Sequence, residues 1–153
     1  MNVARRNNVV FGMMYLVLLS SVCAASVRGL VKEGNRLYSE GQYDEAAQAY
    51  ARAMEENRGC IQAQYNRANA AYKLKEYDSA IPLYKETASQ SIDPALAAAA
   101  KFNLGNAYFQ KGKNQAESEP QTAIDSLEAA IDVWRQAQQM NKGNPSVARN
   151  IEV

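Results

Sequence analysis

The sequence repeats itself at a fixed spacing, and this repeat limits the folds that the chain can adopt. The segment GQYDEA, which begins at Gly41, returns as KEYDSA, which begins at Lys75. Tyr50 and Tyr84 are separated by the same interval. A repeat of about 34 residues is typical of an antiparallel pair of helices that stacks on neighbouring pairs. We therefore expect an all-α fold built from a row of helical hairpins.

A third copy follows the first two. The segment FNLGNAYF from Phe102 corresponds to YNRANAAY from Tyr65, at a slightly longer interval. The additional residues lie in the connector at 91–94. Asp93 and Pro94 in this connector are typical of the start of a helix. After a Gly-Asn-Pro stretch, the last residues resemble the start of another first helix. The expected domain spans 27–153 and has repeats at about 27–60, 61–94 and 95–142, with a partial repeat at 145–153.

Small residues occur in each copy where two helices must approach each other. In each copy a large aromatic residue follows the small residue of the second helix by one helical turn. We expect these residues, Tyr50, Tyr84 and Trp134, to supply large buried area. Gly41 and Gly112 are suited to the turn between helices, whereas Lys75 takes this place in the second copy and predicts a turn that is either strained or differently shaped. The small residues are Gly34, Ala68 and Gly105 in the first helices and Ala46, Ala80 and Ala130 in the second helices.

These residues resemble the tetratricopeptide family over about 27–140. The resemblance implies a right-handed superhelix of about three helical hairpins plus a partial C-terminal helix. Fold and function are separable, so this resemblance alone does not identify what the chain binds.

The third repeat departs from the spacing of the other two. In the first repeat Ala46 closely follows Gly41, whereas Ala130 is much farther from Gly112, which indicates an insertion near 113–125. We expect a polar loop at 113–119 and then a long helix over about 121–140, because apolar residues recur there at helical spacing.

Residues 1–25 have the parts of a secretory signal. Arg5 and Arg6 precede an apolar run at 9–19, and small residues follow that run. We expect cleavage after Ala24 or Ala25. Two alternatives remain open, namely an uncleaved membrane anchor and a lipid attached to Cys23, although Val22 departs from the residue expected before a lipidated cysteine. Each alternative predicts a periplasmic or exported protein that reaches the membrane only through the leader or through lipid on Cys23.

The composition excludes several kinds of function. Lysine and arginine total 17 against 16 for aspartate and glutamate, so no basic surface predicts nucleic-acid binding. The chain has no histidine and only two cysteines, Cys23 and Cys60, which excludes zinc sites and Cys/His nucleophiles. No glycine-rich phosphate loop is present. We expect neither an enzyme nor a cofactor.

The first helices of stacked hairpins line the concave side of such a fold, so their inner residues are candidates for ligand contact. Amide side chains there can hold the backbone of an extended peptide, and aromatic neighbours add apolar area. In the alternative interpretation, these side chains bond along or between helices. A further hypothesis is that Lys32, Arg67 and Lys73 contact a carboxylate. The candidate peptide-binding residues are Asn35, Tyr38, Tyr65, Asn66, Asn69, Tyr72, Lys73, Phe102, Asn103, Asn106 and Phe109.

The leader, the repeat segments GNRLY from Gly34 and FNLGNA from Phe102, and the Asp93-Pro94 connector together resemble the Bat aerotolerance-type tetratricopeptide proteins. The resemblance implies an exported adaptor for protein partners, including membrane proteins with von Willebrand A domains that work with a MoxR-type ATPase. The alternative is a subunit or assembly factor of an envelope or pilus machine that binds through its convex face or long helix.

Overall fold

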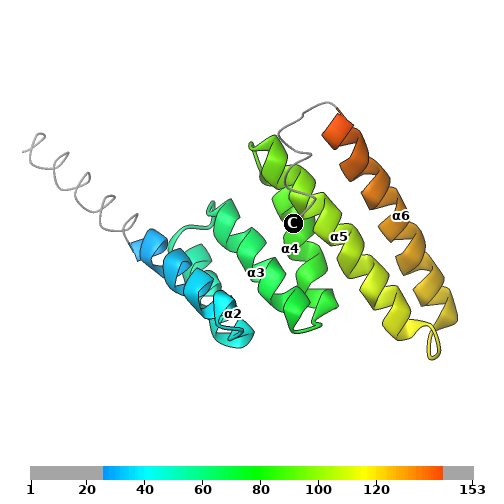
Figure 1. Cartoon of the computed structure of the whole chain (residues 1–153), viewed down its shortest axis with the longest axis horizontal. Coiled ribbons are helices and arrows are strands. Elements are labelled where there is room, and N and C mark those ends of the chain that lie inside the picture. The colour runs from blue at the N-terminus through cyan, green and yellow to red at the C-terminus, as the bar shows by residue number, and fades with distance from the viewer. Residues whose placement is uncertain (1–25, 143–153) are drawn as a thin grey trace, which may run out of the picture.

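The computed structural model of the chain describes residues 26–142 (Figure 1). The predicted leader at 1–25 and the predicted partial repeat at 145–153 lie outside this range. The described residues form helices and contain no strand. A first helix at 26–39 is followed by α2 (Tyr43–Glu56), α3 (Ile61–Lys73), α4 (Tyr77–Gln90), α5 (Pro94–Gln115) and α6 (Pro120–Lys142).

The helices pack in chain order. From α2 onward each helix contacts the next one along the chain, and α3 also touches α5. Figure 1 shows a row of three hairpins, formed by 26–39 with α2, by α3 with α4, and by α5 with α6. The prediction of an all-α fold with three helical hairpins is confirmed.

The small residues allow the close helix contacts that their positions predict. A Cβ atom added to Gly34 would lie 2.5 Å from the ring of Tyr50, and one added to Gly105 would overlap the indole of Trp134 in the same way. Ala46, Ala80 and Ala130 are completely buried in the second helices. The aromatic ring of each second helix therefore lies over a small residue of its partner helix, and this contact sets how closely the two helices pack.

The two turns between helices of the first and second repeats have the expected backbone. Gly41 has φ of 79° and Lys75 has φ of 64°. Both values lie in the left-handed region, which a residue with a Cβ atom enters at a cost. The predicted strain at Lys75 is confirmed.

The insertion in the third repeat differs from its prediction. It lengthens both helices: α5 continues through Gln115, and only residues 116–119 separate it from α6. Gly112 is not a turn residue but lies buried within α5, where an added Cβ would be 2.9 Å from Cγ of Leu127. The prediction of a turn at Gly112 was wrong, because this glycine serves close helix packing. The loop predicted at 113–119 is confined to 116–119, because residues 113–115 continue α5.

Candidate functional site

The first helices bring their asparagines together in pairs. Nδ2 of Asn66 donates to Oδ1 of Asn35 at 2.9 Å, and Nδ2 of Asn103 donates to Oδ1 of Asn69 at 3.1 Å. Each bond joins one first helix to the next, from 26–39 to α3 and from α3 to α5. We call the surface that these residues and Asn106 form the asparagine face.

The aromatic residues of the second helices also bond to this face. The hydroxyl of Tyr50 donates to Oδ1 of Asn35 at 2.8 Å, and the hydroxyl of Tyr84 donates to Oδ1 of Asn69 at 2.6 Å. In the third repeat, Nε1 of Trp134 donates to Oδ1 of Asn106 at 3.2 Å.

Sequence reasoning missed these three aromatic residues as part of the site. A signal was present in the spacing. The first two pairs have a sequence separation of 15 and the third has one of 28, and the excess equals the length of the insertion predicted at 113–125.

The bonds between helices occupy Oδ1 of Asn35, Asn69 and Asn106, and bonds of this kind are what the alternative interpretation of the asparagines supposed. The same bonds leave donors available. Nδ2 of Asn35 and Nδ2 of Asn106 donate to no residue in the part of the chain that the structure describes. Because Asn35 and Asn106 are held through their Oδ1 atoms, the direction of each of these amide groups is fixed. The face therefore presents oriented N–H donors rather than a full set of amide groups.

Three of the predicted tyrosines are held by a second aromatic ring. Tyr38 packs edge-on against Tyr43 at 5.1 Å between ring centroids, Tyr65 against Tyr84 at 6.0 Å, and Tyr72 against Tyr77 at 5.5 Å. Burial raises the pKa of each of the three predicted tyrosines above its usual value. These hydroxyl groups remain neutral hydrogen-bonding groups at ordinary pH.

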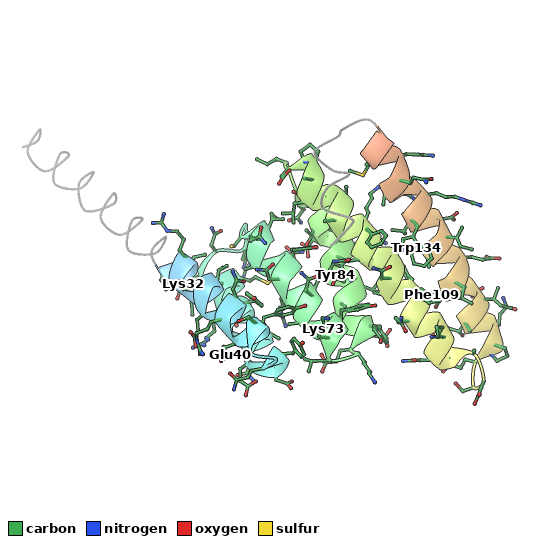
Figure 2. The ribbon with its side chains drawn as sticks, viewed as in Figure 1. Lys32, Glu40, Lys73, Tyr84, Phe109 and Trp134 are labelled. Atoms are coloured by element: carbon green, nitrogen blue, oxygen red, sulfur yellow. The ribbon has the colours of Figure 1, made fainter. Side chains whose placement is uncertain are left out.

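The remaining predicted residues lie apart from these pairs. Phe109 packs against Trp134 (Figure 2), at 5.7 Å between ring centroids. Nζ of Lys113 lies 5.7 Å from the Phe109 ring centroid. Phe102 is half-buried on α5, and Lys73 is exposed at the end of α3. Phe102, Phe109 and Lys73 do not line the hollow described next.

A hollow of about 160 Å³ opens on the asparagine face. Its size suits a single side chain or a stretch of backbone rather than a whole small molecule, for which sites are typically about 300–1,000 Å³. All of its lining side chains are uncharged at neutral pH. The lining residues are Asn35, Tyr38, Tyr50, Asn66 and Asn69.

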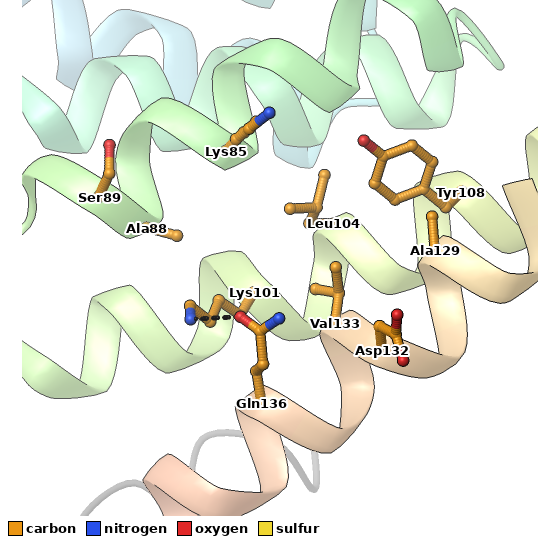
Figure 3. A pocket seen from close by; sticks show the side chains of 10 residues that line it. All are labelled: Lys85, Ala88, Ser89, Lys101, Leu104, Tyr108, Ala129, Asp132, Val133 and Gln136. Carbon is orange, nitrogen blue, oxygen red and sulfur yellow. Dashed lines mark hydrogen bonds between the residues drawn. The ribbon is translucent and has the colours of Figure 1, made fainter.

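A second and larger groove lies between α4 and α6 and has α5 as its floor (Figure 3). Its volume is about 460 Å³. Leu104 and Val133 supply apolar surface, while Nζ of Lys101 donates to Oε1 of Gln136 at 2.8 Å across one end. Sequence analysis did not single out this groove, because it exists only where α4 and α6 are held apart by α5.

Two further properties bear on function. No group of three or more His, Cys, Asp or Glu side chains within residues 26–142 could hold a metal ion. In the same part of the chain, no helix combines the length and the apolar character needed to cross a membrane.

Comparison with known proteins identifies the repeat. Residues 31–95 match the family described as tetratricopeptide repeat. The small glutamine-rich tetratricopeptide repeat-containing protein 2 of Mycosarcoma maydis is 30% identical over 119 residues, which are 78% of this chain and 31% of that protein. The chain thus spans about a third of the length of this relative.

Two solved structures are similar to the chain. The N-terminal domain of stress-induced protein-1 (STI-1) from C. elegans has a TM-score of 0.66 and 16% identity, with 85% of this chain and 94% of that chain covered. This likeness supports the fold alone. The first tetratricopeptide domain of Spaghetti (RPAP3), bound to the HSP90 peptide SRMEEVD, has a TM-score of 0.42 and 20% identity, with 84% of this chain and 95% of that chain covered.

Proposed function

We propose that this chain, a tetratricopeptide-repeat protein, is an adaptor that holds an extended segment of a partner protein on its asparagine face. Tetratricopeptide domains mediate contacts between proteins, and the face supplies the chemistry for such a contact. The observation that carries the proposal is the hollow at Asn35, where an N–H group that donates to no described residue lies beside the Tyr38 and Tyr50 rings.

The donors of the face match the acceptors of a peptide. An extended segment presents a carbonyl oxygen at every residue, and an amide N–H can donate to this oxygen whatever the side chain. Tyr50 and Asn66 both donate to Oδ1 of Asn35 and so order this side chain. Asn35 therefore loses little rotamer freedom on binding.

The neutral lining of the hollow also determines how binding responds to salt. Coulombic attraction between exposed charges is screened by salt, whereas hydrogen bonds to neutral amides and contact with aromatic rings are much less affected. We expect affinity to change by no more than about twofold across the usual range of ionic strength, in contrast to a site that recognises a carboxylate through lysine or arginine. A steep loss of affinity with salt would instead favour the hypothesis that Lys32, Arg67 or Lys73 contacts a carboxylate.

The test uses a peptide selected from a random library displayed on phage, with its affinity measured by calorimetry. Asn35→Asp keeps an Oδ1 atom that accepts from Tyr50 and Asn66 but replaces the free N–H donor with a second oxygen. We expect this variant to bind the peptide roughly tenfold more weakly, which is the upper range for loss of one hydrogen bond. Asn114→Asp, on the exposed part of α5 outside the hollow, is the matched control and should bind normally. Equal affinity in the two variants would refute the proposal.

The larger groove supports a second candidate function, in which the chain joins an envelope or pilus assembly through its other face and its long helix α6. A partner helix that places an apolar side chain between Leu104 and Val133 would use this groove. Ala129→Glu would place a charge at its edge, and loss of binding in this variant but not in Asn35→Asp would favour the second candidate.

We further propose that the protein is exported and works beside the membrane, with von Willebrand A domain proteins among its partners. The basic and apolar parts of residues 1–25 and the resemblance to the Bat aerotolerance-type proteins support this proposal. Cell fractionation together with the mass of the mature chain tests it. A chain found in the cytoplasm with its leader intact would refute export.

A further inference from the structure

The protein itself fills most of the amide oxygens in the hollow on the asparagine face. Oδ1 of Asn35 and Oδ1 of Asn69 each accept two hydrogen bonds from side chains of this chain. An amide oxygen has two lone pairs, so neither atom can accept from a ligand. Oδ1 of Asn66 accepts from Gln62 at 3.0 Å and keeps one lone pair. Nδ2 of Asn35 carries two N–H groups that donate to no residue within 26–142, so amide donors outnumber open amide acceptors in the hollow.

This excess of donors distinguishes between kinds of extended segment. An ordinary peptide presents one N–H donor and one carbonyl acceptor at each residue. Its carbonyl oxygens suit the donor at Asn35, but an N–H group directed at Oδ1 of Asn35 or Asn69 would meet an oxygen with no lone pair left. A buried N–H group that loses water and gains no acceptor weakens binding. Proline has a carbonyl oxygen and no N–H group, so it fits the donors without this cost.

The aromatic rings at the hollow suit the same kind of segment. Tyr38 lines the hollow, is half-buried, and is held edge-on by Tyr43. Tyr72 and Tyr77 form the equivalent pair at the spacing of the repeat, so a segment that crosses from one first helix to the next meets a ring on both. Proline-rich segments form a polyproline II helix, which has no internal hydrogen bonds and docks on surfaces lined by aromatic rings. Such a segment is ordered before it binds and therefore loses little conformational entropy.

We propose that the segment held on the asparagine face is proline-rich, with one proline ring in the hollow against Tyr38 and a carbonyl oxygen of the segment accepting from Nδ2 of Asn35. The hollow of about 160 Å³ takes a single ring of this kind. All of its lining residues are uncharged at neutral pH, so an acidic or basic side chain gains no ion pair there. This inference rests on the proposed function and narrows it to one class of partner segment.

The phage selection described above tests this inference separately from the proposed function. We expect the peptides whose binding is weakened by Asn35→Asp to contain proline. Binders that are weakened by Asn35→Asp but lack proline would overturn this inference and leave the proposed function standing. A selection without any binder that responds to Asn35→Asp would refute both.

Replacement of single prolines in a selected peptide tests the role of the missing N–H group. Alanine and N-methylalanine both lack the proline ring, but only alanine restores the N–H group. At the proline that occupies the hollow, calorimetry should show roughly tenfold weaker binding of the alanine peptide than of the N-methylalanine peptide. In Asn35→Asp the second carboxylate oxygen can accept from the restored N–H group, so the difference should shrink to about twofold or less. Equal affinities of the two peptides for the original chain at every proline would overturn the inference.

A pair of protein variants tests the contact with the ring. Tyr38→Leu removes the ring from the hollow and should weaken the proline peptide roughly fivefold. Tyr43→Leu breaks the same ring pair from outside the hollow and should leave the affinity within about twofold of the original value. Unchanged affinity in Tyr38→Leu, or an equal loss in both variants, would overturn the proposed contact between proline and Tyr38.

Discussion

The hydroxyl group of Tyr84 donates a 2.6 Å hydrogen bond to Oδ1 of Asn69, which ties the second helix of the middle hairpin to the asparagine face. Tyr84 is only 1% exposed, and its ring packs in the core beside Ala68 and Ala80. One side chain therefore supports the core and fixes the direction of a surface amide. This link makes the shape of the candidate binding face depend on packing inside the hairpin.

Tyr84→Phe should destabilise the protein by about 1 kcal/mol, the usual net contribution of one hydrogen bond. The ring still fills its site, but Oδ1 of Asn69 retains only the donor from Asn103. Urea unfolding measures the change, which should lower the midpoint without altering the slope, because the same surface is exposed on unfolding.

Tyr108→Phe is the matched control for this experiment. Tyr108 is half-buried and packs against the same core cluster, but its hydroxyl group bonds to no residue within 26–142. We expect its substitution to change the free energy of unfolding by less than about 0.5 kcal/mol. Equal destabilisation by the two substitutions would show that the bond to Asn69 is not the cause.

Gly105→Ala should destabilise the protein by roughly 1–3 kcal/mol, because the new methyl group would overlap the indole of Trp134 and force it to move. Gly29→Ala is its control, since nothing lies within 4 Å of a Cβ at Gly29 and the residue lies within the first helix. Alanine there should be neutral or should stabilise by up to about 1 kcal/mol. Thermal unfolding of both variants measures the difference, and an unchanged midpoint in Gly105→Ala would show that the indole moves aside at little cost.

Much of the fold could be predicted from the sequence because the same pair of contacting residue types recurs in each copy of the repeat. Gly34 and Tyr50 recur as Ala68 and Tyr84, so one contact rule applies to both hairpins. The third hairpin keeps this contact, with Gly105 beneath Trp134, but its turn differs, because Gly112 lies within α5. A glycine at a turn and a glycine beneath a neighbouring side chain have the same signature in sequence, and only the packing of Leu127 on Gly112 distinguishes them.

The site was less predictable than the fold. Spacing placed Asn35 and Asn69 in equivalent positions, but it did not indicate which atom of each amide is occupied. The structure shows that Oδ1 of Asn35 accepts from Tyr50 and Asn66, whereas its Nδ2 atom donates to no residue within 26–142. The groove beside Leu104 had no signal, since it depends on the separation of α4 from α6 rather than on a residue pattern.

Stability should fall at alkaline pH because the buried tyrosines hold their protons more tightly in the folded protein. Burial, and then the charge of ionised Tyr38, raises the pKa of Tyr50 from 10.0 to about 12, against the opposing effect of the neighbouring Asn66 side chain. Burial also raises the pKa of Tyr84. A raised folded pKa gives stability that is complete below the unfolded value near pH 10 and is lost as the pH rises through about 12.

Urea unfolding between about pH 8 and pH 12 measures this loss, and the ultraviolet absorbance of tyrosinate reports the titration. Tyr50→Phe cannot ionise at this position, so its stability should decline less steeply above pH 10 than that of the original chain. Parallel curves for the two proteins would assign the alkaline loss to other groups.

The turns at Gly41 and Lys75 predict a reciprocal pair of effects. Lys75 has φ of 64°, in a region that disfavours a side chain, so Lys75→Gly should stabilise the protein by about 1 kcal/mol through relief of strain, less the entropy that glycine adds to the unfolded chain. Gly41 has φ of 79° with nothing within 4 Å of an added Cβ, so Gly41→Ala should destabilise the protein by a similar amount through backbone strain alone. Neither residue lines the hollow on the asparagine face, so peptide affinity should be unchanged in both variants. One substitution removes a Cβ atom at a left-handed turn position and the other adds a Cβ atom at the equivalent position. Thermal midpoints that move in the same direction would therefore contradict the explanation.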